Sequence, residues 1–102
     1  MIRKEKLRPY GKTVLQLPAD YKILAVKRFN EEPVLFYLSR SPGEGVCSVT
    51  VEGVGTGYKG VPEGEYLGSL KIGGFYKHYF LVETALNFEE PDYTVNRWDI
   101  GL

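Results

Sequence analysis

Residues 66–82 read YLGSLKIGGFYKHYFLV, and this stretch decides the fold class. Two runs rich in leucine, isoleucine, tyrosine and phenylalanine flank the pair Gly73-Gly74. Glycine tolerates the backbone conformation that a two-residue hairpin turn requires, and aromatic and branched residues favour strands on either side. The stretch therefore predicts a β-hairpin with strands over residues 66–72 and 75–82.

The rest of the chain repeats this pattern of short strands between turn residues. Further strands are expected over residues 13–17, 21–29, 34–38 and 46–52. Asn30-Glu31-Glu32 is typical of a short hairpin connection. No segment carries a convincing apolar stripe at helical spacing, and the best helical candidate, 84–90, meets Pro91. The sequence predicts an all-β fold: a small antiparallel sandwich or partly open barrel of about six or seven strands, with an irregular or short-helical C-terminal tail.

The residue patterns of two of these strands also indicate which of their faces are buried. Residues 46–52 alternate, with Cys47, Val49 and Val51 on one face, as in a half-buried strand. Residues 34–38 are apolar on both faces, which indicates a central strand or one covered by another subunit. A homodimer or a higher oligomer is compatible with the second alternative.

The 102 residues suit one domain, and their charges are unevenly spread although the net charge is zero. A basic head, residues 1–12, has a net charge of +4, whereas residues 84–102 have −3. We expect a single β domain over residues 1–83 and an acidic, aromatic tail over residues 84–102. The head could meet phosphate or an acidic surface and the tail a basic partner, or the two ends could solvate the protein or pair with each other.

Cysteine usage and hydropathy indicate the compartment. Cys47 is the single cysteine, which cannot form an internal disulfide and favours a reducing compartment. The N-terminus has no apolar run behind its charges, and no segment approaches the roughly 20 apolar residues that cross a bilayer. We therefore expect a cytoplasmic protein with no membrane partner.

Residues 55–60, GTGYKG, match the pattern G-x-G-x-x-G. A dinucleotide-binding loop needs a helix that opens from the last glycine, but here Gly64 follows and the chain then alternates as a strand. A glycine hinge or bulge is the favoured interpretation. The alternative is a nest of backbone amides that binds a small nucleotide-like anion, with these ligand-binding residues: Gly55, Thr56, Gly57, Tyr58, Lys59 and His78.

His78 is the only histidine of the chain. In a strand it shares a face with Tyr76, Phe80 and Val82, and we expect that face to be buried. A lone histidine among aromatic residues is usually a hydrogen-bonded core residue; the alternatives are an enzyme that uses His78 or a nucleophile pair with Cys47. A metal site would need clustered partners, so we expect no catalytic residue, no metal and no cofactor.

Basic and aromatic residues stand side by side in places, as in platforms that stack single-stranded nucleic acid. Zero net charge and an isoelectric point near 6.6 argue against a dedicated nucleic-acid binder. The tail combines acidic with aromatic residues, which in a polar segment anchor it on the domain itself or on a partner. The expected partner-binding residues are Phe88, Tyr93, Arg97 and Trp98.

Six short motifs follow one another over about residues 13–83. They are Leu15-Gln16-Leu17-Pro18, Lys22-Ile23-Leu24-Ala25-Val26, Pro33-Val34-Leu35-Phe36-Tyr37-Leu38, Gly55-Thr56-Gly57-Tyr58, Tyr66-Leu67-Gly68-Ser69, and residues 75–83 with His78 inside. Their order resembles a group of small phage-encoded proteins of unknown function, which usually have histidine where Tyr58 stands. The resemblance implies a compact β protein from a phage or prophage that acts in a bacterial cell, and it carries no activity to transfer.

The sequence favours a non-enzymatic binding protein. In the phage setting that the resemblance implies, such a protein binds a host bacterial protein and inhibits or redirects it, in host takeover or anti-defence. The alternative is an oligomeric sponge that sequesters a small nucleotide-like signalling ligand at the glycine-rich loop. An enzyme that uses His78 is the third hypothesis.

Overall fold

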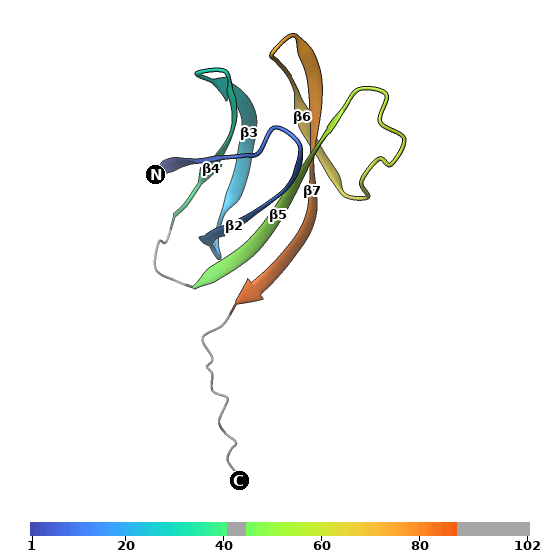
Figure 1. The fold of residues 1–102 in the computed structure, drawn as a ribbon. Coiled ribbons are helices and arrows are strands. Elements are labelled where there is room, and N and C mark those ends of the chain that lie inside the picture. Colours follow the sequence, from blue (N-terminus) through green and yellow to red (C-terminus); the bar gives the residue numbers. More distant parts are fainter. Residues whose placement is uncertain (41–44, 88–102) are drawn as a thin grey trace.

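The computed structural model describes residues 1–40 and 45–87, and these residues form seven strands and no helix (Figure 1). The strands are β1 (Ile2–Lys6), β2 (Gly11–Pro18), β3 (Lys22–Phe29), β4 (Glu32–Leu38), β5 (Val46–Gly55), β6 (Glu65–Ile72) and β7 (Phe75–Asn87). Every strand pairing in these residues is antiparallel. The predicted all-β fold class is confirmed.

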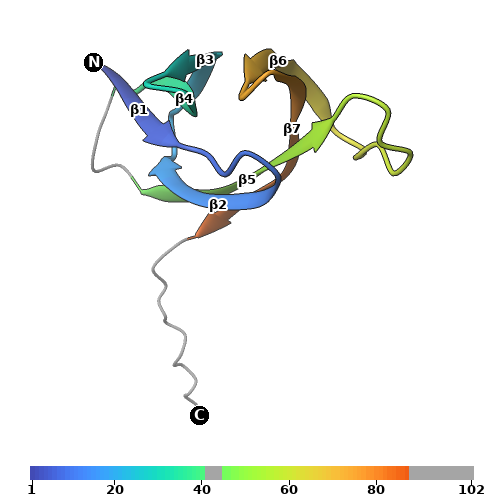
Figure 2. The same ribbon diagram turned by 45° about the horizontal axis from the view of Figure 1, so that its top comes forward.

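The strands form two sheets that do not close into one barrel. The three-stranded sheet has the order β1-β4-β3, and the four-stranded sheet has the order β2-β5-β7-β6. Figure 2 shows the two sheets curving around a shared interior, with β3 facing β6 across an opening. The guanidinium Nη1 of Arg28 in β3 donates to the carbonyl oxygen of Lys71 in β6 at 3.1 Å and bridges this opening.

The hairpin predicted around the glycine pair is confirmed. Gly73 and Gly74 have φ values of +61° and +86°, and Ile72 pairs with Phe75 across them. Two successive positive φ values produce a turn whose twist matches that of the flanking strands. The same turn therefore sets the register between β6 and β7.

The hairpin expected at residues 30–32 is also present, with a turn of two residues. Asn30 and Glu31 have φ values of +53° and +62°, and Phe29 pairs with Glu32, which already belongs to β4. Asparagine adopts this left-handed conformation readily, whereas glutamate does so at a cost in free energy. The turn is therefore formed in spite of the residue at its second position.

The core lies between the two sheets. Cys47, Val49 and Val51 face inward and are at most 2% exposed, which confirms their predicted shared face. The residues that they pack with are Leu7, Leu15, Leu17, Val26, Leu35, Tyr37 and Tyr79. β4 is the central strand of its sheet, as the two apolar faces of residues 34–38 indicated.

The glycines at the end of β5 make room for two tyrosine rings. A Cβ atom on Gly53 would lie 2.7 Å from Cε1 of Tyr79 and 2.8 Å from the carbonyl oxygen of Pro9. Tyr79 is completely buried, and its hydroxyl donates to that same carbonyl at 3.2 Å. Tyr10 occupies the corresponding place over Gly55, 3.5 Å from an added Cβ. These glycines therefore serve strand packing, and the expectation that no helix follows them is confirmed.

β7 continues past the predicted domain boundary at residue 83 and ends at Asn87. Residues 84–87 pair with β5, from Thr84 opposite Val49 to Asn87 opposite Val46, so the short helix considered for residues 84–90 is wrong for this part. The predicted partner-binding residues Phe88, Tyr93, Arg97 and Trp98 lie outside the described residues. Within the described residues, no helix is long and apolar enough to cross a membrane.

Candidate functional site

The turn that follows β5 is tied to β7 by backbone hydrogen bonds. The amide of Thr56 donates to the carbonyl oxygen of Tyr76 at 3.2 Å, and the amide of Tyr58 donates to that of Gly55 at 3.1 Å. The turn at Thr56-Gly57 is therefore closed on itself and attached to the neighbouring strand. Because the Thr56 amide is engaged, it is not available to an anion.

His78 joins three segments of the chain. It lies in β7, opposite Val54 of β5 and Ser69 of β6. Its Nε2 is 2.7 Å from Oγ1 of Thr56, and its Nδ1 is 2.9 Å from the hydroxyl oxygen of Tyr66. Both ring nitrogens thus have partners, one in the turn and one in β6.

The Thr56 hydroxyl has two partners. It lies 2.7 Å from Nε2 of His78 and 3.5 Å from the carbonyl oxygen of Tyr76, which can only accept. Which atom donates in each of the two contacts of His78 depends on the tautomer of the imidazole. The imidazole therefore bridges two hydroxyl groups, those of Thr56 and Tyr66.

The prediction of which face of β7 is buried was wrong. Tyr76 is 55% exposed, and His78 and Phe80 are half-buried. The opposite face is the inner one, with Lys77 only 5% exposed and Tyr79 fully buried. His78 is therefore a hydrogen-bonded residue on the outer face of the four-stranded sheet rather than a core residue.

The contacts of the Lys77 ammonium allow this charged side chain to lie on the inner face. Its ammonium donates to the carbonyl oxygen of Ile72 at 2.8 Å, and it lies 4.9 Å from the ring centroid of Tyr10 and 6.0 Å from that of Phe75. A ring face attracts a cation electrostatically. Lys77 thus connects the segment before β2 to the β6–β7 hairpin.

An aromatic surface covers the outer face of β5, β6 and β7 around His78. We define it by Tyr58, Val61, Tyr66, His78 and Phe80. The rings of Tyr66 and Phe80 meet edge to face, with centroids 5.2 Å apart and planes at 64°. Together with Val54 and the Gly55–Gly57 turn, these residues line a hollow of about 210 Å³, the His78 hollow.

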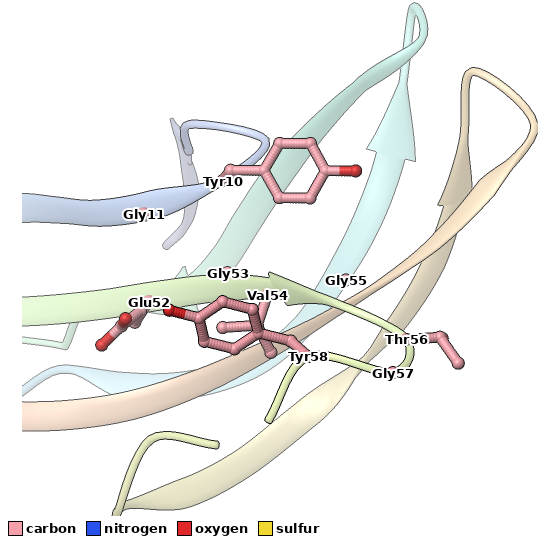
Figure 3. A pocket seen from close by; sticks show the side chains of 9 residues that line it. All are labelled: Tyr10, Gly11, Glu52, Gly53, Val54, Gly55, Thr56, Gly57 and Tyr58. Carbon is pink, nitrogen blue, oxygen red and sulfur yellow. The ribbon is translucent and has the colours of Figure 1, made fainter. Parts of the chain in front are cut away.

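A second hollow of about 450 Å³, the Tyr10 hollow, lies on the other side of the same turn. Its side walls come from Tyr10, Glu52 and Tyr58, and the end of β5 and its turn form the rest. Figure 3 shows the Tyr10 ring beside the β5 ribbon, while Tyr58 lies next to Val54 with its hydroxyl directed toward Glu52. The lining combines two phenol rings with one carboxylate.

Tyr79 packs from inside the core against Gly53, which lines the Tyr10 hollow. Burial raises the pKa of Tyr79 to about 12, and the nearby hydroxyl of Tyr10 contributes in the same direction. Removal of the phenolic proton would place a charge among apolar side chains, which is unfavourable. Tyr79 therefore supports the site as a neutral, hydrogen-bonded side chain.

The structure brings together most of the predicted ligand-binding residues. Gly55, Thr56, Gly57 and Tyr58 line both hollows, and His78 lines the smaller one. Lys59 is exposed and lines neither hollow. Sequence reasoning missed eight residues of the linings: Tyr10, Gly11, Glu52, Gly53, Val54, Val61, Tyr66 and Phe80.

The nucleophile pair considered for Cys47 and His78 is not formed. Cys47 is buried on the inner face near one end of β5, whereas His78 lies on the outer face opposite Val54 near the other end. Among the described residues, no group of three or more histidine, cysteine, aspartate or glutamate side chains is placed to hold a metal ion. The chemistry that this site offers is contact by aromatic rings and hydroxyl groups.

Comparisons with known proteins add no family to this geometry. No family model matches the sequence, and neither a curated protein nor a solved structure matches it significantly. The functional argument therefore depends on the site.

Proposed function

We propose that this protein is a non-catalytic binding protein whose aromatic surface docks on a partner protein. One observation carries the proposal: Tyr58, Val61 and Tyr66 are 58%, 60% and 52% exposed around a single hollow. Tyrosine is enriched at the centres of protein interfaces, because its ring offers a large rigid contact area and its hydroxyl a hydrogen bond. Exposed large side chains gathered around one hollow are typical of a docking surface.

The aromatic surface is held in place before any partner arrives. Tyr66 is fixed by its hydrogen bond to His78, and Thr56 fixes the turn that precedes Tyr58. At the end of the loop that joins β5 to β6, Gly64 packs directly on the backbone of Leu81. A Cβ atom at this position would clash with the carbonyl oxygen of Leu81. Preorganisation of this kind lowers the entropy lost on binding.

The placement of Cys47 supports a role other than catalysis by the pair considered above. Cys47 is buried in the core on the inner face and does not meet His78, which lies on the outer face. The alternative of an enzyme that uses His78 predicts that His78→Ala abolishes turnover without loss of the fold.

The phage-like resemblance suggests which partner to test. On that resemblance the partner is a host bacterial protein, which binding would inhibit or redirect in the cytoplasm. Asn87 lies nine residues beyond His78 along β7, or roughly 30 Å at the usual rise of a strand. β7 therefore ends far from the aromatic surface, and on this proposal Phe88, Tyr93, Arg97 and Trp98, which lie outside the described residues, provide a separate contact.

A second candidate function is the sequestration of a small nucleotide-like ligand by an oligomer. The Tyr10 hollow favours it, because about 450 Å³ suits a small molecule and two phenol rings could stack on a base. The carboxylate of Glu52 and the engaged amide of Thr56 weigh against an anionic ligand. A thermal-shift screen with nucleotides and cyclic nucleotides tests this candidate, because a ligand that binds the native state raises its stability.

Affinity capture from a bacterial lysate tests the main proposal. The parent chain, Tyr58→Ser and Val14→Ser would be compared, since Val14 is 61% exposed on β2 but lies outside the aromatic surface. We expect the parent and Val14→Ser to retain the same protein and Tyr58→Ser to lose it. Equal capture by all three would remove the aromatic surface from the account. A bound small molecule without a bound protein would favour the second candidate.

A further inference from the structure

The outer face of the three-stranded sheet carries a stripe of apolar side chains between two rows of lysines. Residues directly opposite each other on paired strands share a face. On β4, Val34, Phe36 and Leu38 alternate with the inward-facing Leu35 and Tyr37. The lysines beside this stripe are Lys4 and Lys6 on β1 and Lys22 and Lys27 on β3. We call these seven residues the lysine-bordered stripe.

The register places each lysine next to an apolar residue of β4. Lys4 pairs with Phe36, and Lys22 pairs with Leu38. Lys6 and Lys27 both pair with Val34, one from each side. Since β4 lies between β1 and β3, a partner cannot add to its edge and has to lie along its face (Figure 2).

The charges of the stripe are incompletely balanced. Glu32 forms an ion pair with Lys6 at 3.2 Å, and the Lys4 ammonium lies 4.9 Å from the ring centroid of Phe29. Lys22 and Lys27 have no ion pair in the part of the chain that the structure describes. The four lysines of the stripe and Glu32, their ion-pair partner, sum to +3, although the whole chain is neutral.

A cavity lies at one end of the stripe, next to the β3–β4 turn. This cavity of about 490 Å³ is lined by Lys4, Glu5, Lys6, Phe29, Asn30, Glu32 and Val34. Val34 is only 2% exposed although it belongs to the outer face, so it contributes buried apolar surface to this cavity. The lysine side chains are long and flexible, so their ammonium groups can border this surface when a partner is bound.

We propose that the lysine-bordered stripe binds an extended acidic segment of a protein partner. Alternate residues recur about every 6.6–6.8 Å along a strand. An extended peptide has the same repeat, so apolar side chains at every second position would meet Val34, Phe36 and Leu38. Carboxylates at the positions between them would lie near the lysines, and this charge complementarity selects the occupant.

A nucleic acid fits this face less well than a peptide does. Stacking on bases needs exposed ring faces, and of the aromatic residues on this face Phe36 is half-buried and Phe29 is 48% exposed. Glu32 would also repel a phosphate. The stripe lies on the other sheet from the aromatic surface, so this inference does not depend on the proposed function.

The test uses the full chain and a short labelled peptide of alternating glutamate and leucine. Fluorescence anisotropy would compare the parent with Lys22→Glu/Lys27→Glu and with the matched control Lys12→Glu/Lys71→Glu, which makes the same charge change on the four-stranded sheet. We expect binding that weakens with salt, a loss of about tenfold or more in the first variant and little change in the control. A peptide of alternating glutamate and serine should bind more weakly, because it lacks the apolar contacts.

Other outcomes would overturn the proposal. Equal binding by the two double variants would show that net charge, and not the stripe, attracts the peptide. Binding of oligothymidylate or of anionic lipid vesicles without binding of the peptide would assign the face to another partner. Lys22→Gln/Lys27→Gln replaces the first variant if charge reversal prevents folding, and parent-like affinity in that folded variant would contradict the proposal equally.

Discussion

Nε2 of His78 lies 2.7 Å from Oγ1 of Thr56, and this contact fastens the turn after β5 to the first part of β7. The other ring nitrogen is held by Tyr66 at 2.9 Å, so the imidazole is oriented from both sides. The turn and β6, which both contribute to the aromatic surface, are therefore connected through one side chain.

Replacement of His78 by alanine should destabilise the protein without abolishing the fold. The variant loses two hydrogen bonds on a half-buried face, and we expect a free energy of unfolding lower by about 1–3 kcal/mol. Chemical denaturation measures this difference. Tyr66→Phe is the partial control, because it removes only the bond to Nδ1 and should cost about half as much. Unchanged stability in His78→Ala would mean that these bonds do not hold the site together.

Gly53→Ala and Gly55→Ala should behave differently although both residues lie in β5. The added methyl group on Gly53 would meet the Tyr79 ring and the Pro9 carbonyl, and forced contacts of this kind cost about 1–3 kcal/mol. On Gly55 the nearest atom is 3.5 Å away, which is ordinary van der Waals contact. Thermal unfolding of the two variants checks this expectation, and equal melting temperatures would contradict the packing described for Tyr79.

Glu31→Gly should stabilise the β3–β4 hairpin. Glu31 has a φ of +62°, which glycine adopts without strain, and the resulting Asn-Gly pair suits this turn type. The ion pair with Arg28, at 3.9 Å between exposed side chains, contributes little. We expect a gain of about 0.5–1 kcal/mol in the free energy of unfolding, measured by chemical denaturation.

Glu31→Ala is the matched control for this prediction. It removes the same ion pair but keeps a side chain at positive φ, so it should bring no gain. If alanine stabilises the protein as much as glycine does, backbone strain at residue 31 is not the cause.

Stability should fall at alkaline pH because of Tyr79. The pKa of Tyr79 is raised from 10.0 to about 12 in the folded state, mainly by burial. Between these values the unfolded chain loses the phenolic proton while the native state retains it, so stability decreases as pH rises. Below pH 10 this group has no effect on stability.

The free energy of unfolding, measured by chemical denaturation at several pH values between 10 and 12, should depend less on pH in Tyr79→Phe than in the parent. Some dependence of stability on pH will remain in this variant, because burial and the neighbouring Glu5 also raise the pKa of Tyr37. If the free energy of unfolding depends on pH in Tyr79→Phe as strongly as in the parent, Tyr79 ionises freely in the native state.

The parts of the fold that could be predicted are those that local sequence determines. The glycine pair at 73–74 defined a turn and hence two strands. The alternation of Cys47, Val49 and Val51 defined an inner face, because each side chain is apolar and small enough to pack. Neither inference needed knowledge of a distant part of the chain.

The face of β7 could not be predicted by the same reasoning. Each face of residues 75–82 carries three apolar or aromatic residues, so counting them does not distinguish the face with Tyr76 and Phe80 from the face with Lys77. The lysine is accommodated inside because Tyr10, far away in the sequence, places its ring near the ammonium. Only the tertiary structure brings that ring to β7.

Tyr66 was missed as a site residue because of a bulge. Counted outward from the turn, regular pairing would place Tyr66 opposite Leu81, on the face away from His78. The register shifts between Tyr66 and Gly68, so Tyr66 pairs with Phe80 instead. The bulge therefore moves its side chain to the face of His78, and Gly68, with a φ of +141°, is the sequence signal of this shift that was not used.

The most direct test of the aromatic surface is amide hydrogen exchange of the protein with and without the captured partner. We expect binding to slow exchange in the segments that carry the surface, residues 54–61 and 65–68, and Tyr58→Ser to remove this protection together with the affinity. Protection confined to β1, β4 and β3, with none in residues 54–61, would contradict the claim that the protein binds its partner through the aromatic surface.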